Sequence, residues 1–330
     1  MPRLDQKNIL VTGGAGFIGS HLVDRIVQES PDKVIVIDNL FLGKESNLAD
    51  ARKYFPKLKF YNKDASVYED LKELITNEKV DVVFDLAVIP LPTSLEKPRW
   101  TIDVNVAIIS VLCDLLREGY YKTLIHFSSS EAYGTAQYVP MNENHPLFPI
   151  TPYAASKVAG DHIALSYWQT FGLDISIIRP FNTFGPRQND ETYAGVIPVV
   201  IKRALHGNPV IINGDGEQTR DYVFVGDVID AAVRIYEESS ARGKPINIAS
   251  GKEISINELV RKILFSLDIN VPILHEAPRI GDVRRLCGDI HLARQLIGFE
   301  PTIGLDEGLA KTISWYKEIF SEKWSCAGGQ

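Results

Sequence analysis

Short apolar runs alternate with longer helical patterns through the first half of the sequence, and this alternation limits the folds that the chain can adopt. Six runs rich in Val and Ile show no polar alternation and each predict a strand buried on both faces: NILVTG, VIVIDN, KFYNKD, DVVFDLA, TLIHFSSS and ISIIRPFN. Helical patterns lie between or after them at residues 20–29, 68–77, 101–118 and 153–171. Repeated β–α–β units of this kind predict an α/β fold with a Rossmann-like, doubly wound parallel sheet.

The pattern changes beyond about residue 180. Turn clusters such as FGPRQNDET, NGDGEQTRD and SARGKP separate short strands and helices there. We therefore expect a first domain over residues 1–180 and a smaller C-terminal α/β lobe over residues 181–330. The boundary is expected to be interleaved, because some later segments should return to the main sheet.

Charge and cysteine content argue against several classes of protein. The formal net charge of -7 argues against nucleic acid or an anionic membrane as a main partner. No apolar run is long enough to span a bilayer, and the N-terminal residues lack the apolar core of a signal peptide. Cys113, Cys287 and Cys326 have no metal-binding spacing. We therefore expect a cytoplasmic protein with reduced thiols and no metal site.

A glycine motif follows the first predicted strand and opens a helix. Gly13, Gly16 and Gly19 form G-x-x-G-x-x-G, which allows a tight turn and close approach of the backbone to a pyrophosphate. The next strand ends at Asp38, whose carboxylate can accept hydrogen bonds from a ribose 2′-hydroxyl and would repel a 2′-phosphate. The spacing therefore predicts NAD rather than NADP. Asp64, after the third strand, is either an adenine contact or a turn residue.

The segment TPYAASK places Tyr153 and Lys157 four residues apart on one face of a helix. A phenol is normally too basic to lose its proton near neutral pH. A nearby lysine ammonium, together with an oxidised nicotinamide, favours the phenolate. The pair therefore predicts a proton-transfer site.

In this order the motifs resemble the extended short-chain dehydrogenase/reductase family, in its nucleotide-sugar epimerase/dehydratase group. The resemblance covers nearly the whole chain and rests on TGGAGFIG, DNL, DVVFDLA, FSSSEAYG, TPYAASK, RPFNTFGPRQ, VIPVVI, NGDGEQTRDYVFVGDV and GDVRR. It implies an NAD-dependent enzyme that acts on a nucleotide sugar through a transient 4-keto sugar and keeps its NAD. It also implies a homodimer that pairs through the helix of Tyr153 and the helix near residues 101–118.

The resemblance further implies roles for individual residues. Ser129 and Tyr153 would flank the sugar 4-hydroxyl, and Lys157 would hold the nicotinamide ribose. The implied cofactor residues are Gly13, Gly16, Phe17, Ile18, Gly19, Asp38, Asn39, Asp64, Ala65, Leu86, Ala87 and Lys157. The implied substrate residues are Ser94, Ser130, Asn182, Val196, Arg220, Arg284 and Arg285, with Asn182 at the diphosphate and the arginines at phosphate or the nucleoside ribose.

The chain departs from the family pattern after the fourth predicted strand. Asp85-Leu86-Ala87-Val88 replaces the usual His-Leu-Ala-Ala, and Pro90 and Pro92 are expected to stiffen the following loop beside the sugar. Ser94, in the same segment, either reaches toward the site or caps the loop.

Glu131 bears on the reaction, because oxidation at C4 makes the neighbouring C5 proton acidic. A 4-epimerase needs no further acid or base, whereas a 4,6-dehydratase needs a base at C5 and an acid for the departing 6-hydroxyl; a decarboxylase instead loses carbon dioxide. Dehydratases usually have Asp where Ser130 stands, and Glu131 could also serve only to orient a loop or a water. With Ser129, Glu131, Tyr153 and Lys157 as catalytic residues, our first prediction is a 4,6-dehydratase of a nucleotide hexose or N-acetylhexosamine.

Four alternatives stay open. They are a nucleotide-sugar 4-epimerase, a glucuronate decarboxylase, a non-catalytic protein that senses NAD or a nucleotide, and a dehydrogenase that releases its cofactor.

Overall fold

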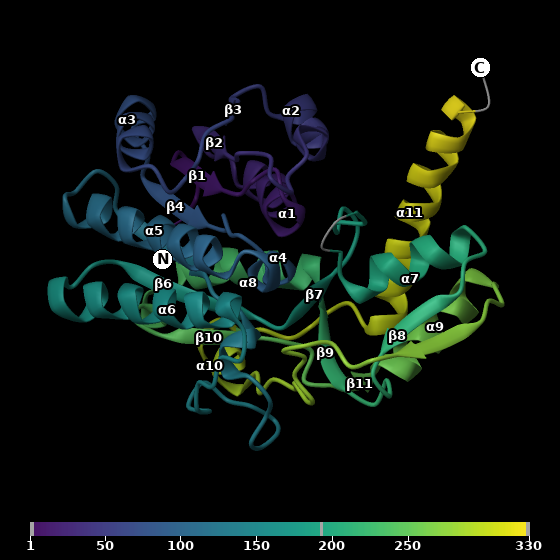
Figure 1. The fold of residues 1–330 in the computed structure, drawn as a ribbon. Coiled ribbons are helices and arrows are strands. Elements are labelled where there is room, and N and C mark those ends of the chain that lie inside the picture. The colour runs from purple at the N-terminus through teal and green to yellow at the C-terminus, as the bar shows by residue number, and fades with distance from the viewer. Residues whose placement is uncertain (1–2, 192–193, 328–330) are drawn as a thin grey trace.

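A seven-stranded parallel sheet forms the centre of the computed structural model, which describes residues 3–191 and 194–327, with side chains as far as Phe320 (Figure 1). The strand order is β10-β6-β5-β4-β1-β2-β3. The strands are β1 (Asn8–Thr12), β2 (Lys33–Ile37), β3 (Leu58–Tyr61), β4 (Val82–Asp85), β5 (Thr123–Phe127), β6 (Ile175–Pro180) and β10 (Pro245–Ile248). All six strands predicted from apolar runs are present, and the predicted Rossmann-like fold is confirmed.

Helices cover both faces of this sheet, which explains why its strands lack polar alternation. On one face α1 (Phe17–Ile26) packs beside α8 (Val225–Glu237). On the other face lie α3 (Tyr68–Glu78), α5 (Pro98–Arg117) and α6 (Pro152–Phe171), of which α5 and α6 run side by side (Figure 1). Each face therefore has its own hydrophobic core, and the carboxyl ends of the strands are left open between them.

A smaller lobe carries most of the later elements around a third core. Its three-stranded sheet has the order β11-β9-β7, and a separate parallel pair joins β12 to β8. The lobe comprises β7 (Asn182–Phe184), α7 (Val196–Leu205), β8 (Val210–Asn213), β9 (Thr219–Phe224), β11 (Glu253–Ser255), α9 (Ile256–Leu267), β12 (Ile273–Glu276) and α11 (Leu305–Ala327).

Several segments beyond residue 180 lie with the main sheet rather than with the smaller lobe. β10 is hydrogen-bonded to β6, and α10 (His291–Ile297) packs against β10. α8 packs against α1 and the underside of the sheet. The two parts of the molecule are thus interleaved along the chain.

The segment after β4 differs from the stiff loop that its prolines led us to expect. It forms a short helix, α4 (Leu91–Glu96), with Pro90 at the N-cap and Pro92 in the first turn. Proline is tolerated there because the first N–H groups of a helix have no intrahelical acceptor. In the described part of the chain, no helix combines the length and the apolar content needed to cross a membrane.

Candidate functional site

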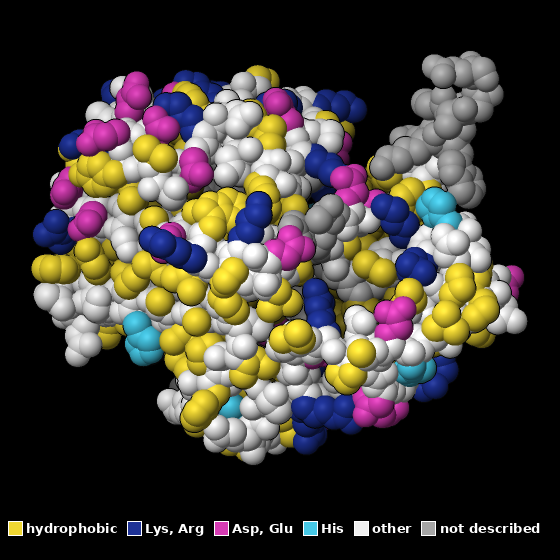
Figure 2. Space-filling view, in the orientation of Figure 1, with side chains coloured by type: hydrophobic (Ala, Val, Ile, Leu, Met, Phe, Trp, Pro, Cys, Tyr) yellow, Lys and Arg dark blue, Asp and Glu magenta, His cyan; other side chains and the backbone are white. Residues whose placement is uncertain are grey.

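A cavity of about 830 Å³ lies between the carboxyl edge of the main sheet and the smaller lobe. The space-filling view shows the surface hollowed between the main body and the lobe that carries α7 (Figure 2). Its wall combines residues that follow β1, β2, β4, β5 and β6 with residues of β8 and β9. Such a cavity at the carboxyl ends of parallel strands is where open α/β sheets bind ligands.

Most of the residues singled out in the sequence line this one cavity. From the glycine motif and the segments after β2, β3 and β4 these are Gly13, Gly16, Phe17, Ile18, Gly19, Asp38, Asn39, Asp64, Ala65, Leu86 and Ala87. From the segments after β5 and β6 and from α6, α7 and β9 they are Ser129, Ser130, Glu131, Tyr153, Lys157, Asn182, Val196 and Arg220. The fold therefore brings the glycine motif and the serine, tyrosine and lysine residues to the same cavity.

The glycine loop has no room for side chains. Gly13 has a φ of +65°, and a β-carbon there would lie 2.8 Å from the backbone nitrogen of Ala87. A side chain at Gly19 would collide with the carbonyl oxygen of Gly13. α1 begins directly after Gly16, so its free N–H groups open toward the cavity. This cradle fits a pyrophosphate.

Asp38 lies at the end of β2 beside that cradle. Its carboxylate accepts hydrogen bonds from the N–H of Ala15 at 3.0 Å and of Leu40 at 2.8 Å. Burial raises the pKa of Asp38, while these backbone N–H groups act in the opposite direction. A carboxylate has about four acceptor sites, so lone pairs remain for a ribose diol. The residues present therefore fit the NAD that the sequence predicted.

Asp64 makes a turn and also lines the cavity. Its Oδ1 accepts hydrogen bonds from the N–H of Ser66 at 2.8 Å and from the Ser66 hydroxyl at 2.7 Å. Both alternatives considered for this residue are thus compatible with its position.

Lys157 and Tyr153 project from the first turns of α6. The Thr151 hydroxyl accepts a hydrogen bond from the N–H of Ala154 at 3.1 Å and caps the helix, which fixes where α6 begins. Lys157 Nζ donates to the carbonyl oxygen of Phe127 at 2.7 Å. Burial lowers the pKa of Lys157, while Asp85 and Asp161 raise it.

The surroundings of Tyr153 disfavour its phenolate form when no ligand is bound. Burial raises the pKa of Tyr153 to about 12, although a hydrogen bond with Ser129 acts to lower it. The charge of Glu131 adds to the increase. A phenol that is buried and held by a serine can exchange its proton with a substrate hydroxyl once a cation binds nearby.

Glu131 lies on the cavity wall just beyond β5. Its N–H donates to the hydroxyl of Ser129 at 3.2 Å, which caps a 3₁₀ turn over Ser130–Tyr133. Burial raises the pKa of Glu131, and Asp282 adds to the increase, while Arg220 and Arg279 act to lower it. A carboxyl group of this kind can take up and release a proton closer to neutral pH than an exposed glutamate.

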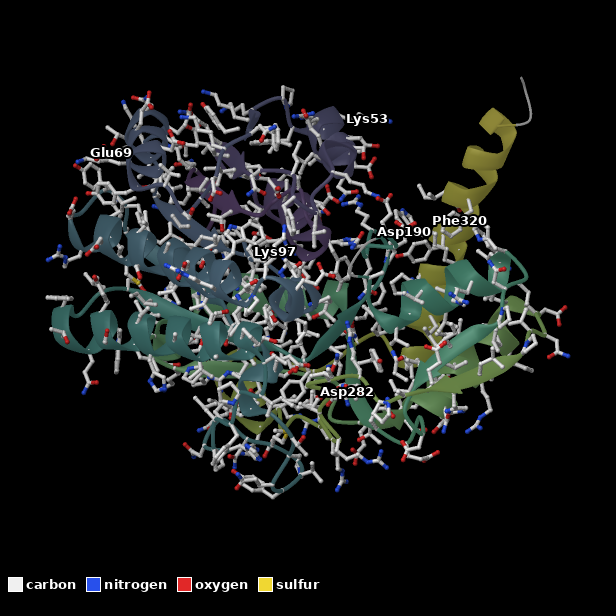
Figure 3. All side chains as sticks on the ribbon, viewed as in Figure 1. Lys53, Glu69, Lys97, Asp190, Asp282 and Phe320 are labelled. Carbon is white, nitrogen blue, oxygen red and sulfur yellow. The ribbon has the colours of Figure 1, made fainter. Side chains whose placement is uncertain are left out.

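Arg220 is already paired within the protein. Its guanidinium forms a short ion pair with Asp282 and donates to the carbonyl oxygen of Thr219 at 2.8 Å. Gln218 Nε2 also donates to Asp282, at 3.2 Å. Asp282, labelled in Figure 3, thus fixes this wall of the cavity.

Three predicted substrate residues lie outside the cavity lining. The Ser94 hydroxyl donates to the carbonyl oxygen of Leu91 at 2.7 Å within α4, so Ser94 stabilises its own helix. Arg284 binds the carboxylate of Asp215 at 2.8 and 3.0 Å. Arg285 forms a bidentate pair with Glu253. Both arginines are exposed, and their guanidinium groups are already bound to carboxylates at the surface.

The sequence reasoning missed other residues of the wall. Gln218 and Asp282 belong to the motifs NGDGEQTRD and GDVRR and line the cavity. Each is a polar residue two positions before an arginine, and this pattern could have identified both as candidate site residues. Arg279 and Tyr222 also line the cavity, and the fold alone brings them there. Among the described side chains, no group of three or more His, Cys, Asp or Glu residues is placed to hold a metal ion.

Comparisons with known proteins find similar chains and similar folds. The chain is 38% identical over 311 residues to a putative UDP-glucose 4-epimerase of Methanocaldococcus jannaschii, covering 94% of this chain and 98% of that protein. The crystal structure of UDP-glucose 4-epimerase from Thermotoga maritima with UDP-glucose matches with a TM-score of 0.89 and 32% identity, over 95% and 99% of the two chains.

A dehydratase is comparably similar. DesIV, the dTDP-glucose 4,6-dehydratase of Streptomyces venezuelae with NAD and TYD bound, matches with a TM-score of 0.89 and 30% identity, over 94% of this chain and 97% of that one. The sequence profile of the family described as GDP-mannose 4,6 dehydratase matches residues 10–312. The chain therefore belongs to the GDP-mannose 4,6 dehydratase family.

Proposed function

We propose that the protein is an NAD-dependent 4,6-dehydratase of a nucleotide hexose or N-acetylhexosamine. The observation that carries this proposal is Glu131, a carboxyl group with a raised pKa on the wall of the cavity that also holds Tyr153 and Lys157. Chemistry limited to C4 needs no such group. Chemistry at C5 and C6 does.

The first step is oxidation of the sugar at C4. Tyr153 takes the proton of the 4-hydroxyl, and Ser129 holds that hydroxyl from the other side. Tyr153 must first give its own phenolic proton to solvent, a loss that the ammonium of Lys157 favours. NAD would be held by the glycine loop and Asp38, and it would supply the chemistry of hydride transfer between C4 and C6 of the sugar.

Elimination of water follows at C5 and C6. Glu131 takes the C5 proton, which the 4-ketone has made acidic. Two protons have then been taken up by the protein, one on Tyr153 and one on Glu131. One of them leaves with the 6-hydroxyl as water, and the other returns to C5, so the product is a 4-keto-6-deoxy sugar and NAD is regenerated. Because Ser130 is not an acid, Glu131 must act both as base and as acid.

Epimerisation at C4 is the second candidate function. It is favoured by the 38% identity to a putative UDP-glucose 4-epimerase over nearly the whole chain. In that case the first step is unchanged, the ketone turns over in the cavity, and Glu131 only orients the Ser129 segment through its backbone contact at 3.2 Å.

A panel of nucleotide sugars read by mass spectrometry separates these functions. Loss of water indicates a dehydratase, loss of carbon dioxide a decarboxylase, and an unchanged mass with a new retention time an epimerase. Glu131→Gln should abolish the loss of water. The matched control is Glu143→Gln, because burial also raises the pKa of Glu143. Glu143 does not line the cavity, and its carboxylate accepts a hydrogen bond from the N–H of Asn247 at 2.9 Å. Unimpaired turnover of Glu131→Gln would overturn the dehydratase proposal.

We also propose a homodimer that pairs through α5 and α6. Hydrophobic side chains gather on the surface over these helices (Figure 2). Ile102 on α5 and Phe171 on α6 are 38% and 49% exposed. A two-fold interface would bury them. Sedimentation analysis should give twice the chain mass, and Ile102→Lys should shift it toward the monomer.

A further inference from the structure

A buried arginine on β6 connects two parts of the fold that carry candidate catalytic residues. Arg179 is 2% exposed, and its Nη2 donates to the carboxylate of Asp161 at 2.5 Å. Its Nη1 donates to the phenolic oxygen of Tyr133 at 2.7 Å. Asp161 lies on α6, and Tyr133 ends the 3₁₀ turn that carries Glu131. One guanidinium group therefore binds both the helix of Tyr153 and the turn of Glu131.

The start of this turn is held by β6 and α6. Ser128, which precedes the cap residue Ser129, donates its N–H to the carbonyl oxygen of Ile178 at 2.8 Å. The hydroxyl of Ser128 donates to Asp161 at 2.9 Å. The carboxylate that binds Arg179 thus also holds the chain just before the turn.

The end of the turn is held through Tyr133. Its side chain is fully buried, and its hydroxyl donates to Asn247 Oδ1 on β10 at 2.8 Å while it accepts the bond from Arg179. The guanidinium carbon of Arg179 lies 4.7 Å from the centre of the Tyr133 ring. Arg179 therefore links the end of the turn to its start, because Asp161 binds both Arg179 and Ser128.

Glu131 lies between these two fixed ends. Within the described part of the chain, no group forms a hydrogen bond with its carboxylate, and the N–H of Glu131 donates to the hydroxyl of Ser129. The backbone of the turn alone therefore places the carboxyl group on the cavity wall.

A buried ion pair such as that of Arg179 and Asp161 adds little to stability by itself, since two charges must be removed from water. Its charge-assisted bonds are short and directional, so it does fix a geometry. Tyr153 at the 4-hydroxyl and Glu131 at C5 must reach adjacent carbons of one sugar. A displacement of about 1 Å can lower the rate by roughly a hundredfold. A rigid link between the two elements meets this requirement.

We propose that Arg179 is a positioning residue for Glu131. Through its bonds to Tyr133 and Asp161, Arg179 fixes the turn of Glu131 relative to α6. The inference rests on the proposed function, which gives Glu131 the C5 proton. Arg179 does not line the cavity, so its effect on the reaction is indirect and should fall on the step that uses Glu131.

Tyr133→Phe tests this role with a small change. The ring keeps its place in the core, while Arg179 loses its bond to the turn. The matched control is Tyr121→Phe, which also removes a buried phenol, here one that donates to the carbonyl oxygen of Leu112 at 2.7 Å. Tyr121 does not line the cavity. Both variants lose one buried hydrogen-bonding group, so a difference between them in catalysis reports on position.

The two steps of the reaction are followed in single turnovers in deuterium oxide. The NAD-bound enzymes are mixed with a nucleotide sugar that the wild type converts, and the absorbance of reduced nicotinamide and the deuterium at C5 are recorded. In Tyr133→Phe the reduced nicotinamide should appear at nearly the wild-type rate, because the start of the turn and α6 keep their bonds. It should then persist, and deuterium at C5 should appear roughly tenfold to a hundredfold more slowly.

The control Tyr121→Phe should match the wild type in both steps. If Tyr133→Phe removed the C5 proton as fast as the wild type, the positioning role would be overturned. Arg179→Lys is the second variant, because a lysine keeps a charge beside Asp161 but lacks the planar fork that binds two partners. It should show the same delay at C5, and a wild-type C5 step in folded Arg179→Lys would contradict the role of the guanidinium.

Amide hydrogen exchange of the NAD-bound protein without a sugar separates this inference from the proposed function. The turn is closed by bonds from the N–H of Ala132 to Ser129 and from the N–H of Gly134 to Glu131, each at 3.1 Å. In Tyr133→Phe these amides should exchange faster, while those of β5 and α6 keep their wild-type rates.

Unchanged exchange in the turn would overturn the inference for any reaction that the enzyme catalyses. A wild-type enzyme that removes no C5 proton would overturn only the proposed function. Faster exchange in the turn of Tyr133→Phe would then still support the link that Arg179 makes between the turn and α6.

Discussion

Gly43 approaches Asp38 so closely that a β-carbon on Gly43 would lie 2.7 Å from Asp38 Oδ1. Gly43→Ala should therefore displace the carboxylate from its bonds to Ala15 and Leu40 and lower NAD affinity by roughly tenfold. Calorimetric titration with NAD measures the effect. Gly304→Ala is the control, because nothing lies within 4 Å of a β-carbon there and its affinity should be that of the wild type.

Tyr153→Phe should lower turnover of the nucleotide sugar by about 10²–10⁴-fold, because it removes the group that takes the 4-hydroxyl proton. NAD binding should be retained, since the hydroxyl is replaced only by hydrogen. Tyr138→Phe, which changes an exposed phenol bonded to Asn142 at 3.0 Å, serves as the control. Wild-type turnover in Tyr153→Phe would instead support a protein that only senses its ligands.

Glu131→Gln should stabilise the fold at neutral pH. Because burial raises the pKa of Glu131, the folded protein holds this proton more tightly than the unfolded chain does, and stability falls as pH rises above the unfolded value of about 4.3. The variant should therefore melt at a higher temperature than the wild type at pH 7, and the difference should shrink at or below pH 4. A variant less stable than the wild type at pH 7 would contradict the raised pKa.

Glu78 should show the opposite pH dependence. Burial acts to raise the pKa of Glu78, but Lys59, Tyr61 and Lys33 bind its carboxylate and lower the pKa to about 2. The stability that this adds is present above about pH 4.3 and is lost as pH falls toward 2. Glu78→Gln should thus lower the free energy of unfolding by about 1–2 kcal/mol at pH 7.

Denaturant melts at several pH values measure this difference. The control is Glu69→Gln on the exposed side of the same helix, labelled in Figure 3. If Glu78→Gln lowered the free energy of unfolding equally at pH 7 and pH 2.5, the lowered pKa of Glu78 would be contradicted.

The main sheet could be predicted from the sequence because its strands are buried on both faces. Burial of this kind requires continuous apolar runs, and the runs ending at Thr12, Ile37 and Phe127 stand out clearly. α4 could not be predicted with the same rule. Pro90 and Pro92 break helices in most positions, and only their place at its first turn makes them compatible with one.

The candidate site was predictable where one local segment supplies the geometry. Gly13, Tyr153 and Lys157 belong to such segments, and each lines the cavity. The roles of arginines are harder to predict, because the sequence does not show which carboxylate the fold will bring next to a given arginine. Arg284 and Arg285, which we predict to bind substrate, pair with Asp215 and Glu253 at the surface of the ligand-free structure, and their substrate role stays a prediction.

The place of β10 in the sheet bears on how the chain can be made and divided. During synthesis the backbone edge of β6 has no partner until residues 245–248 have left the ribosome, after the segments that form much of the smaller lobe. Until then Ile177 and Ile178 lie on an open, apolar edge that can pair with another nascent chain. A gene fragment cut at residue 180 would therefore encode a protein that aggregates rather than a minimal nucleotide-binding domain.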